Sequence, residues 1–339
     1  MEGFSTPDKR SQVVVLEANT SYWDKSRGPR VRRIVFDNSV SQKEAVELVK
    51  SGESRVDLVT EVSPLETLRV AESRHATVVK RRGTHAAVFG RFNMRKPASP
   101  WNDLRVREAA NLAINRADLV RYAANGNGVI VSALLPGAGD PGLGPYPFDS
   151  RRARDLLREA GHPGGLSITV IAPPDLQPQA TVTSKMLEQA GFKPALQVLD
   201  ATVYTQKTLL SHLDQPAERQ TWDIALTLSN DVTNFPAFDI YHWFAIDGPD
   251  DWVTEQPELR RLYEQVLATV DPAKQDALIR QMERHTRDQA YVLFLYNPIR
   301  LYAVNRGVDF VAYAKAWTRL ADTGVTDHHW SLRKGTGKK

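Results

Sequence analysis

The chain has 339 residues, no cysteine and a formal net charge of +4 at pH 7. Hydrophobic residues make up 42% and charged residues 25%, a composition that is typical of globular proteins and excludes an intrinsically disordered chain. The lack of cysteine excludes disulfides, thiol nucleophiles and cysteine-bound zinc. Since the length exceeds what one compact core usually contains, we expect two lobes.

Signals for membrane insertion, export and nucleic-acid binding are weak. No apolar run approaches the ~20 residues that cross a bilayer. The opening MEGFSTPDKRSQ has no apolar core of the kind that a secretion signal contains, so no signal peptide is expected in this chain. The basic excess has no aromatic ladder, recognition helix or zinc finger beside it, so we expect no nucleic-acid partner.

Apolar periodicity predicts a sheet-rich first part of the chain. Strands are expected at 12–18, 32–38, 55–62, 76–82 and 86–94. A short helix is expected at 41–52, where Gly52 supplies the left-handed residue that commonly ends a helix.

Helices and strands alternate further along the chain. Asn102 or Asp103 is expected to cap one helix, and Asp149 to cap another that ends at Gly161. The other expected elements are strands at 166–172, 196–200, 222–230 and 291–305 and helices at 180–192, 257–270 and 272–289. This alternation predicts an α/β fold.

Four segments carry a resemblance to a known family. In chain order they read VVVLEANTSYWDKSRGPRVRRIVF, FNMRKPASPWNDLRVREAANLAINRADLV, YPFDSRRARDLLREAGHPGG and WDIALTLSNDVTNFP. Their order and spacing resemble the extracellular solute-binding proteins of ABC transporters that carry peptides, dipeptides, nickel complexes and related solutes (solute-binding protein family 5). The resemblance does not identify the ligand, because the family shares its scaffold motifs and varies its cleft.

The resemblance implies a two-lobed α/β fold like that of the periplasmic binding proteins, also called a Venus flytrap. Residues 1–96 and 293–330 are expected to form the remaining part of the first lobe, which is sheet-rich. Residues 97–292 are expected to form the second lobe, which is α/β. Residues 331–339 are expected to be a disordered basic tail.

The resemblance also implies a mechanism. A ligand shifts the equilibrium between open and closed lobes, and permease subunits of an ABC transporter recognise the closed form. Asn93, Pro97 and Val292 are the expected hinge residues, because they lie where the chain crosses between lobes. The implied protein is a non-catalytic component of the periplasm or cell envelope that binds a peptide or another small molecule and is a monomer when complete.

The N-terminal part of the chain departs from the family. Family members have preceding sequence that supplies the export signal, several strands of the first lobe and part of the cleft wall. The first lobe is therefore expected to be incomplete, and we interpret the chain as a fragment of a longer gene product rather than a reduced protein. A truncated fragment without function is a further alternative. With an exposed sheet edge, the chain is expected to be unstable alone or to self-associate.

Asp231 has the best position for ligand binding. It follows the apolar strand at 222–230, and open α/β sheets place ligands at the carboxyl ends of strands. The resemblance implies that this aspartate pairs with the α-ammonium group of a peptide, as in peptide-binding relatives, and that Leu228 and Ser229 line the same pocket. The alternative is that Asp231 only caps the turn before Asn234.

Three further residues are candidates for the cleft. Phe235 lies in an aromatic loop that either forms an apolar wall of the ligand pocket or packs in the core. Tyr296 and Asn297 lie on the return strand and are weaker candidates.

Other chemical motifs lack support. The GAGDPG run beginning at Gly137 has the spacing of a nucleotide-binding loop, but prolines break the segment where a helix should begin, so no nucleotide cofactor is expected. Asp327, His328 and His329 could bind a metal, but we interpret them as a surface segment near the end of the chain and expect no metal. The sequence contains no GxSxG nucleophile elbow, and no other motif supports an enzyme. A ligand-sensing domain of a cytoplasmic transcription regulator is the alternative function, since some regulators resemble this fold.

Overall fold

The computed structural model divides the chain into two compact units. Unit 1 comprises Met1–Arg82 and Arg300–Lys339, and unit 2 comprises Gly83–Ile299. The residues that the structure describes are 12–27, 29–52, 56–83, 86–130, 134, 142–209, 215–229, 235–244, 252–254, 256–314 and 319–332. Asp231, Gly137 and the residues 333–339 of the expected tail lie outside this set, whereas Ser331 and Leu332 belong to the short 3-10 helix Trp330–Leu332.

Unit 1 is built mainly from short strands. Its strands are β1 (Val13–Glu17), β2 (Arg33–Asp37), β3 (Leu58–Val59), β4 (Ala76–Arg82), β11 (Val308–Asp309) and β12 (Gly324–Val325), and its helices are α1 (Gln42–Ser51) and α2 (Thr67–Ala71). The long strand β10 (Val292–Asn305) begins in unit 2 and continues into unit 1, where it pairs with β3 and β4. Gly52 ends α1 in the left-handed conformation (φ 79°), as the sequence predicts.

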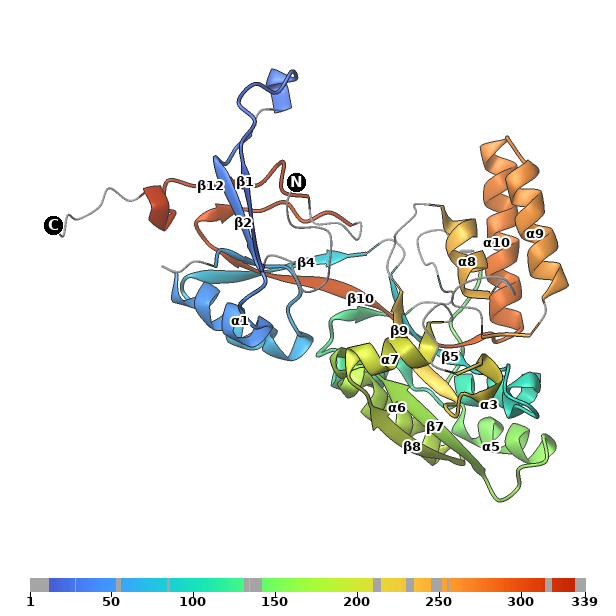
Figure 1. Ribbon diagram of the computed structural model, residues 1–339. Coiled ribbons are helices and arrows are strands. Elements are labelled where there is room, and N and C mark those ends of the chain that lie inside the picture. The colour runs from blue at the N-terminus through green and yellow to red at the C-terminus, as the bar shows by residue number, and fades with distance from the viewer. Residues whose placement is uncertain are drawn as a thin grey trace. The chain divides into compact units, whose positions relative to one another are not determined.

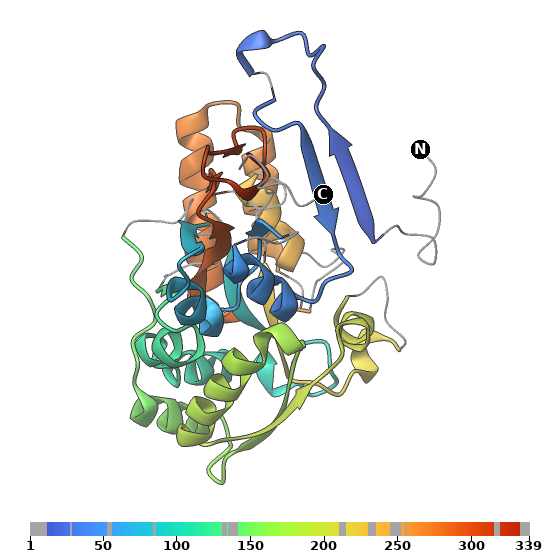
Figure 2. The same cartoon turned by 90° about the vertical axis from the view of Figure 1, so that its left-hand side faces the viewer.

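The strands β1 and β2 form an isolated antiparallel ribbon (Figure 1, Figure 2). The register places Val14 opposite Phe36 and Leu16 opposite Ile34. All five residues of β1 are exposed, and the side chain of Leu16 is half accessible (50%). The ribbon therefore presents apolar residues to solvent on both of its faces, although a two-stranded ribbon gains little stability by itself.

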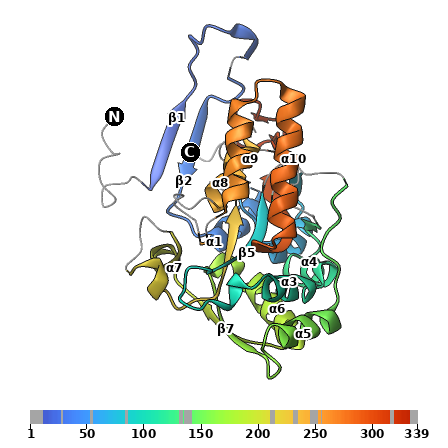
Figure 3. The same ribbon diagram turned by 90° about the vertical axis from the view of Figure 1, so that its right-hand side faces the viewer.

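Unit 2 is a mixed sheet with helices around it. Its helices are α3 (Leu104–Leu112), α4 (Arg116–Ala123), α5 (Ser150–Glu159), α6 (Gln177–Gln189), α7 (Ala201–Thr208), α8 (Pro236–Phe244), α9 (Pro257–Ala268) and α10 (Pro272–Asp288). Its strands are β5 (Ala87–Phe92), β6 (Gly128–Val129), β7 (Leu166–Ala172), β8 (Phe192–Val198), β9 (Ile224–Ser229) and the first part of β10. The helices α9 and α10 lie side by side (Figure 3).

The sheet of unit 2 has the strand order β10-β5-β9-β7-β8, and β6 pairs with β10. The strand β5 runs antiparallel to both β10 and β9, whereas β9, β7 and β8 are parallel to one another. The carboxyl ends of the three parallel strands therefore share one edge of the sheet, and their amino ends share the opposite edge. In α/β sheets the carboxyl edge is the one that binds ligands.

Local sequence explains where the helices of unit 2 begin. The side chain of Asp103 accepts a hydrogen bond from the Arg105 amide and caps α3, and Asp149 caps α5 in the same way through the Arg152 amide. The caps predicted at Asp103 and Asp149 are thus confirmed. On one face of the sheet, Trp101 stacks on Phe92 with ring centroids 4.4 Å apart, which joins the segment before α3 to β5.

The unit boundaries differ from the expected lobe boundaries. They fall at Arg82–Gly83 and at Ile299–Arg300, so residues 83–96 and 293–299 lie in unit 2, and the assignment of lobes stays a prediction. The cause is pairing within the sheet: all six residues of β5 are buried, and this strand pairs with β9 along its whole length.

Candidate functional site

The carboxyl end of β9 carries two of the predicted site residues. Ser229 is buried, and its Oγ accepts a hydrogen bond from the Ala87 amide at 3.2 Å. Leu228 is 43% exposed, although it lies in a strand whose other residues are buried. The end of β9 thus combines a fixed hydroxyl group with an accessible apolar side chain.

The sheet brings these residues close to the return strand. Leu228 lies opposite Val88 of β5, and Val88 lies opposite Tyr296 of β10, after a register irregularity between Phe294 and Tyr296. The side-chain amide of Asn297 donates a hydrogen bond to the Ala86 carbonyl, one residue before β5. The end of β9 and the middle of β10, which are more than sixty residues apart in the sequence, therefore lie on either side of the first residues of β5.

Tyr296 and Asn297 are buried inside unit 2. Gln179 of α6 donates a hydrogen bond from its Nε2 to the Tyr296 hydroxyl at 2.9 Å. Burial raises the pKa of Tyr296, and this hydrogen bond opposes the rise. A Cβ placed on Gly128 would lie 2.6 Å from the Tyr296 ring, so β6 can pass there only because that residue is glycine. These contacts fix the end of the sheet, and contact of Tyr296 or Asn297 with a ligand stays a prediction.

Phe235 lies directly before α8 and packs against the core of unit 2. Its carbonyl accepts hydrogen bonds from the amides of Phe238 and Asp239, which makes it part of the first turn. Asp231 lies outside the described residues, on the connection between Ser229 and Phe235. Its role as a ligand anchor stays a prediction.

Arg91 is a residue near the site that the sequence analysis missed. Its guanidinium is buried and donates to Thr227 of β9 at 2.9 Å and to the Tyr204 hydroxyl of α7 at 3.4 Å. It also lies 5.5 Å from the centre of the Trp243 ring of α8. Arg91 thereby ties α7 and α8 to the sheet. The signal for it in the sequence is a lone arginine in the apolar run of β5.

The expected hinge residues all lie within unit 2. Asn93 is fully buried and donates to the Trp222 carbonyl at 3.3 Å, whereas Pro97 is exposed. Val292 is buried, and its carbonyl accepts a hydrogen bond from the Asn111 side chain at 2.9 Å. Their function as hinges stays a prediction.

Of the two histidines near the C-terminus, His329 is buried within unit 1 and His328 is exposed. His329 Nε2 lies 3.0 Å from Asp57 Oδ1, and the Trp330 indole donates to the same oxygen at 2.9 Å. Among the described residues, no three His, Asp or Glu side chains lie close enough to hold a metal ion. Within the same part of the chain, no helix combines the length and apolar character that crossing a bilayer requires.

Comparison with known proteins assigns the family. The family model for "Bacterial extracellular solute-binding proteins, family 5 Middle" matches residues 7–250. The chain belongs to this family. The resemblance stated from the four sequence segments is therefore confirmed.

Relatives of this family 5 protein include the glutathione-binding protein GsiB of Pectobacterium atrosepticum. It is 27% identical over 198 residues, which cover 57% of this chain and 37% of GsiB. GsiB of Escherichia coli K12 is 34% identical over 115 residues, or 32% of this chain and 22% of its own length. The chain thus matches well under half of the length of these relatives.

Solved structures confirm the two-lobed α/β fold. The ABC transporter substrate-binding protein CtaP of Listeria monocytogenes has a TM-score of 0.79 at 17% identity, and the match covers 94% of this chain and 65% of CtaP. DppA of Helicobacter pylori, solved with the peptide STSA, has a TM-score of 0.77 at 19% identity, and the match covers 93% of this chain and 61% of DppA. The family 5 chain spans about two thirds of each of these structures.

Proposed function

We propose that this chain is a non-catalytic, solute-binding component of an ABC importer that captures a peptide or a similar small solute with a free amino group. The observation that carries the proposal is the convergence of Leu228 and Ser229 with Tyr296 and Asn297 across β5, at the carboxyl edge of the sheet. Family membership supports the class of function.

Asp231 is the proposed anchor of the ligand. In the sequence it follows the end of β9 by two residues, and β9 ends at the edge of the sheet where Leu228 is exposed. The relatives are named for binding glutathione or were solved with a peptide, and both ligands carry an α-ammonium group. A carboxylate at position 231 would pair with such a group. The exposed Leu228 offers an apolar surface of the kind that usually lines small-molecule pockets.

Partners and location belong to the same proposal. The permease subunits of an importer are the proposed partners, the periplasm or cell envelope is the proposed location, and closure of two lobes on the ligand is the proposed mode of capture. Support for these points comes from membership of an extracellular family.

The charge of Asp231 provides the test. In Asp231→Asn the ligand ammonium loses its partner in a desolvated site, which costs about 3 to 5 kcal/mol. At about 1.4 kcal/mol per tenfold, affinity should fall about a hundredfold or more. The measurement is calorimetric titration of a free-amine tetrapeptide and its N-acetylated form into wild type and variant, and the acetylated form should bind wild type as weakly as the free amine binds the variant.

Asp200→Asn is the matched control. Asp200 caps α7 through the Thr202 amide at 2.8 Å, and asparagine retains that cap while removing one negative charge from unit 2. The control should keep wild-type affinity. If the acetylated peptide binds wild type as tightly as the free amine, or if Asp231→Asn loses less than threefold, Asp231 caps the turn and does not hold the ligand.

A further inference from the structure

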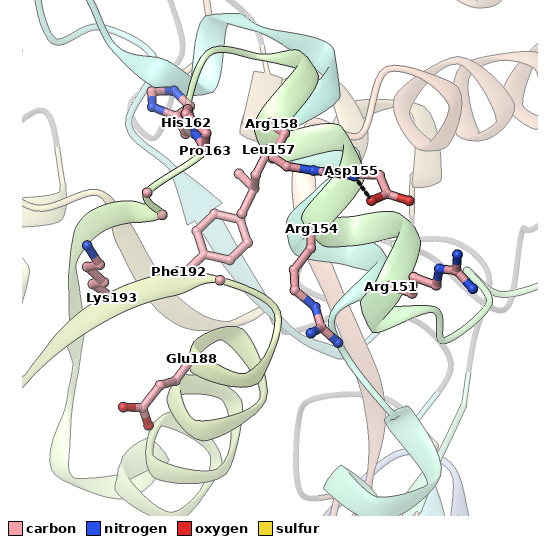
Figure 4. A pocket seen from close by; sticks show the side chains of 13 residues that line it. Arg151, Arg154, Asp155, Leu157, Arg158, His162, Pro163, Glu188, Phe192 and Lys193 are labelled. Atoms are coloured by element: carbon pink, nitrogen blue, oxygen red, sulfur yellow. Dashed lines mark hydrogen bonds and ion pairs between the residues drawn. The ribbon is translucent and has the colours of Figure 1, made fainter.

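A recess lies at the amino edge of the sheet of unit 2, opposite the edge that carries Ser229. It has a volume of about 810 Å³ and is formed by α5, the segment 161–165 that follows it, the end of α6 and the start of β8 (Figure 4). Leu157 and Phe192 occupy the middle of this view, and charged side chains extend around them. The recess therefore has no part in the proposed solute site.

Positive charge predominates around the recess. Its lining includes four basic and two acidic side chains, which are Arg151, Arg154, Arg158, Lys193, Asp155 and Glu188. Arg158 forms an ion pair with Asp155 three residues earlier in α5. The rest of the lining then has three basic groups, on Arg151, Arg154 and Lys193, and one carboxylate, on Glu188.

Two of these basic groups have no partner within the described part of the chain. The side chains of Arg151 and Lys193 are exposed and make no hydrogen bond or ion pair with the described residues. Arg154 uses its Nε to donate to the Ser150 carbonyl at 3.1 Å, which leaves its two terminal nitrogens available. The recess thus presents several unused donors with positive charge.

The fold does not need these cations to complete its helices. The last carbonyls of α5 accept hydrogen bonds from the amides of Ala160 and His162, and Arg105 donates to the Glu159 carbonyl at 2.7 Å. Arg151 even lies in the first turn of α5, which has no acidic residue, so its charge opposes the helix dipole. Local stability therefore gives no reason for a positive charge at Arg151.

The recess also has room for an incoming group. A Cβ added to Gly161 or Gly164 would meet no atom within 4 Å. Gly165 differs, because a Cβ there would lie 2.6 Å from the Gly191 carbonyl oxygen and 3.2 Å from Lys193 Cε. Glycine at that position lets the backbone pass close to Gly191 beneath Lys193.

We propose that this recess docks an acidic loop of a partner protein, with two or more Asp or Glu side chains that pair with Arg151, Arg154 and Lys193. The concave shape suits a protruding loop. The carboxylates of Asp155 and Glu188 within the same lining disfavour a flat anionic membrane surface, which would lie against them as well as against the cations, and favour a narrow acidic loop that can reach the cations alone.

The test is binding of a fluorescein-labelled octaglutamate peptide, followed by fluorescence anisotropy in 20 mM salt. Wild type should bind it at least tenfold more tightly than the corresponding octaglutamine peptide. The double variant Arg151→Glu, Lys193→Glu should lose at least tenfold in affinity, and Arg151→Lys with Lys193→Arg should stay within threefold of wild type.

Lys185→Glu with Lys274→Glu is the matched control, because it changes the net charge equally at exposed positions outside the recess. It should lose less than threefold. Equal losses in the two reversed variants would overturn the proposal, since net charge alone would then explain binding. Binding to phosphatidylglycerol vesicles that depends on Arg151 and Lys193, without binding of octaglutamate, would instead assign the recess to a membrane and overturn it too. The same variants are also titrated with the free-amine tetrapeptide. Because the recess is separate from the proposed solute site, a failure of the docking proposal leaves solute binding unchanged.

Discussion

Arg116 shows how one buried side chain can connect several segments. Its guanidinium is almost fully buried and donates to the carbonyls of Phe294, Asn111, Ile114 and Tyr146 at 3.0 to 3.3 Å. Burial lowers the pKa of Arg116 to about 10, so the group remains charged at pH 7. The charge is thus compensated by carbonyl dipoles from β10 and from the end of α3.

Removing this side chain should be costly. In Arg116→Met the buried carbonyls lose their donor, and we expect the free energy of unfolding to fall by at least about 3 kcal/mol. Arg116→Lys should recover only part of this loss, because an ammonium group lacks the planar arrangement of five donors. Urea unfolding followed by tryptophan fluorescence measures the change.

Arg121→Met is the control for that experiment. Arg121 lies on the same helix but is exposed, and its guanidinium lies 5.4 Å from the centre of the Tyr122 ring. Its replacement should change stability by less than about 0.5 kcal/mol. Equal effects at the two positions would mean that burial of Arg116 does not stabilise unit 2.

At the scale of elements, the β1–β2 ribbon has the clearest physical consequence. The sequence VVVL of β1 has β-branched residues, no proline and no charge, and it lies exposed at a strand edge. Such edges pair with other chains unless a charge or a cover prevents it. We therefore expect the purified chain to self-associate as its concentration rises.

Val15→Lys should reduce that self-association, because a charge on an edge strand opposes pairing. Size-exclusion chromatography with light scattering at increasing protein concentration measures it. The control is Val270→Lys, at a valine that is 95% exposed between α9 and α10 and outside any strand. A wild-type chain that stays monomeric throughout would show that the ribbon is not an association site.

The sequence predicted the regular elements of unit 2 well and the irregular ones poorly. Amphipathic periodicity and a capping aspartate identified α5, and Asp103 identified the start of α3. The helix α8 was expected to be a loop, because its aromatic residues show no strict period and Pro236 resembled a breaker, although proline is favoured at a helix start. The strand expected at 55–62 is only Leu58–Val59.

The candidate site was predictable only in part. That Ser229 ends a strand follows from local pattern, but its proximity to Tyr296 depends on β5 pairing with both β9 and β10. Such pairing is a property of the whole sheet and leaves no local signal. The hydrogen bond from Gln179 to Tyr296 and the burial of Arg91 have the same origin.

At the scale of the whole molecule, the two units differ in their cores. The main hydrophobic cluster of the described residues runs from Ala87 to Tyr296 and thus lies entirely in unit 2. Every residue of β5 is buried, whereas β4 of unit 1 is half-buried or exposed except at Ala76. Unit 2 should therefore be the more stable part.

Hydrogen exchange followed by mass spectrometry tests this difference. Amides of β5 and β9 should exchange at least tenfold more slowly than those of β4 under native conditions, because they open only when the larger core does. Adding urea below the midpoint of unfolding should release unit 1 first. A single protection level across both units would show that they unfold together.

The chain enters and leaves unit 2 on neighbouring strands. It enters before β5 and leaves along β10, and these two strands form an antiparallel pair. The ends of residues 83–299 are therefore adjacent, so a short linker could join them at little entropic cost. Because unit 2 is one continuous stretch between the two parts of unit 1, it could be exchanged between proteins as one piece or circularly permuted by a protein engineer.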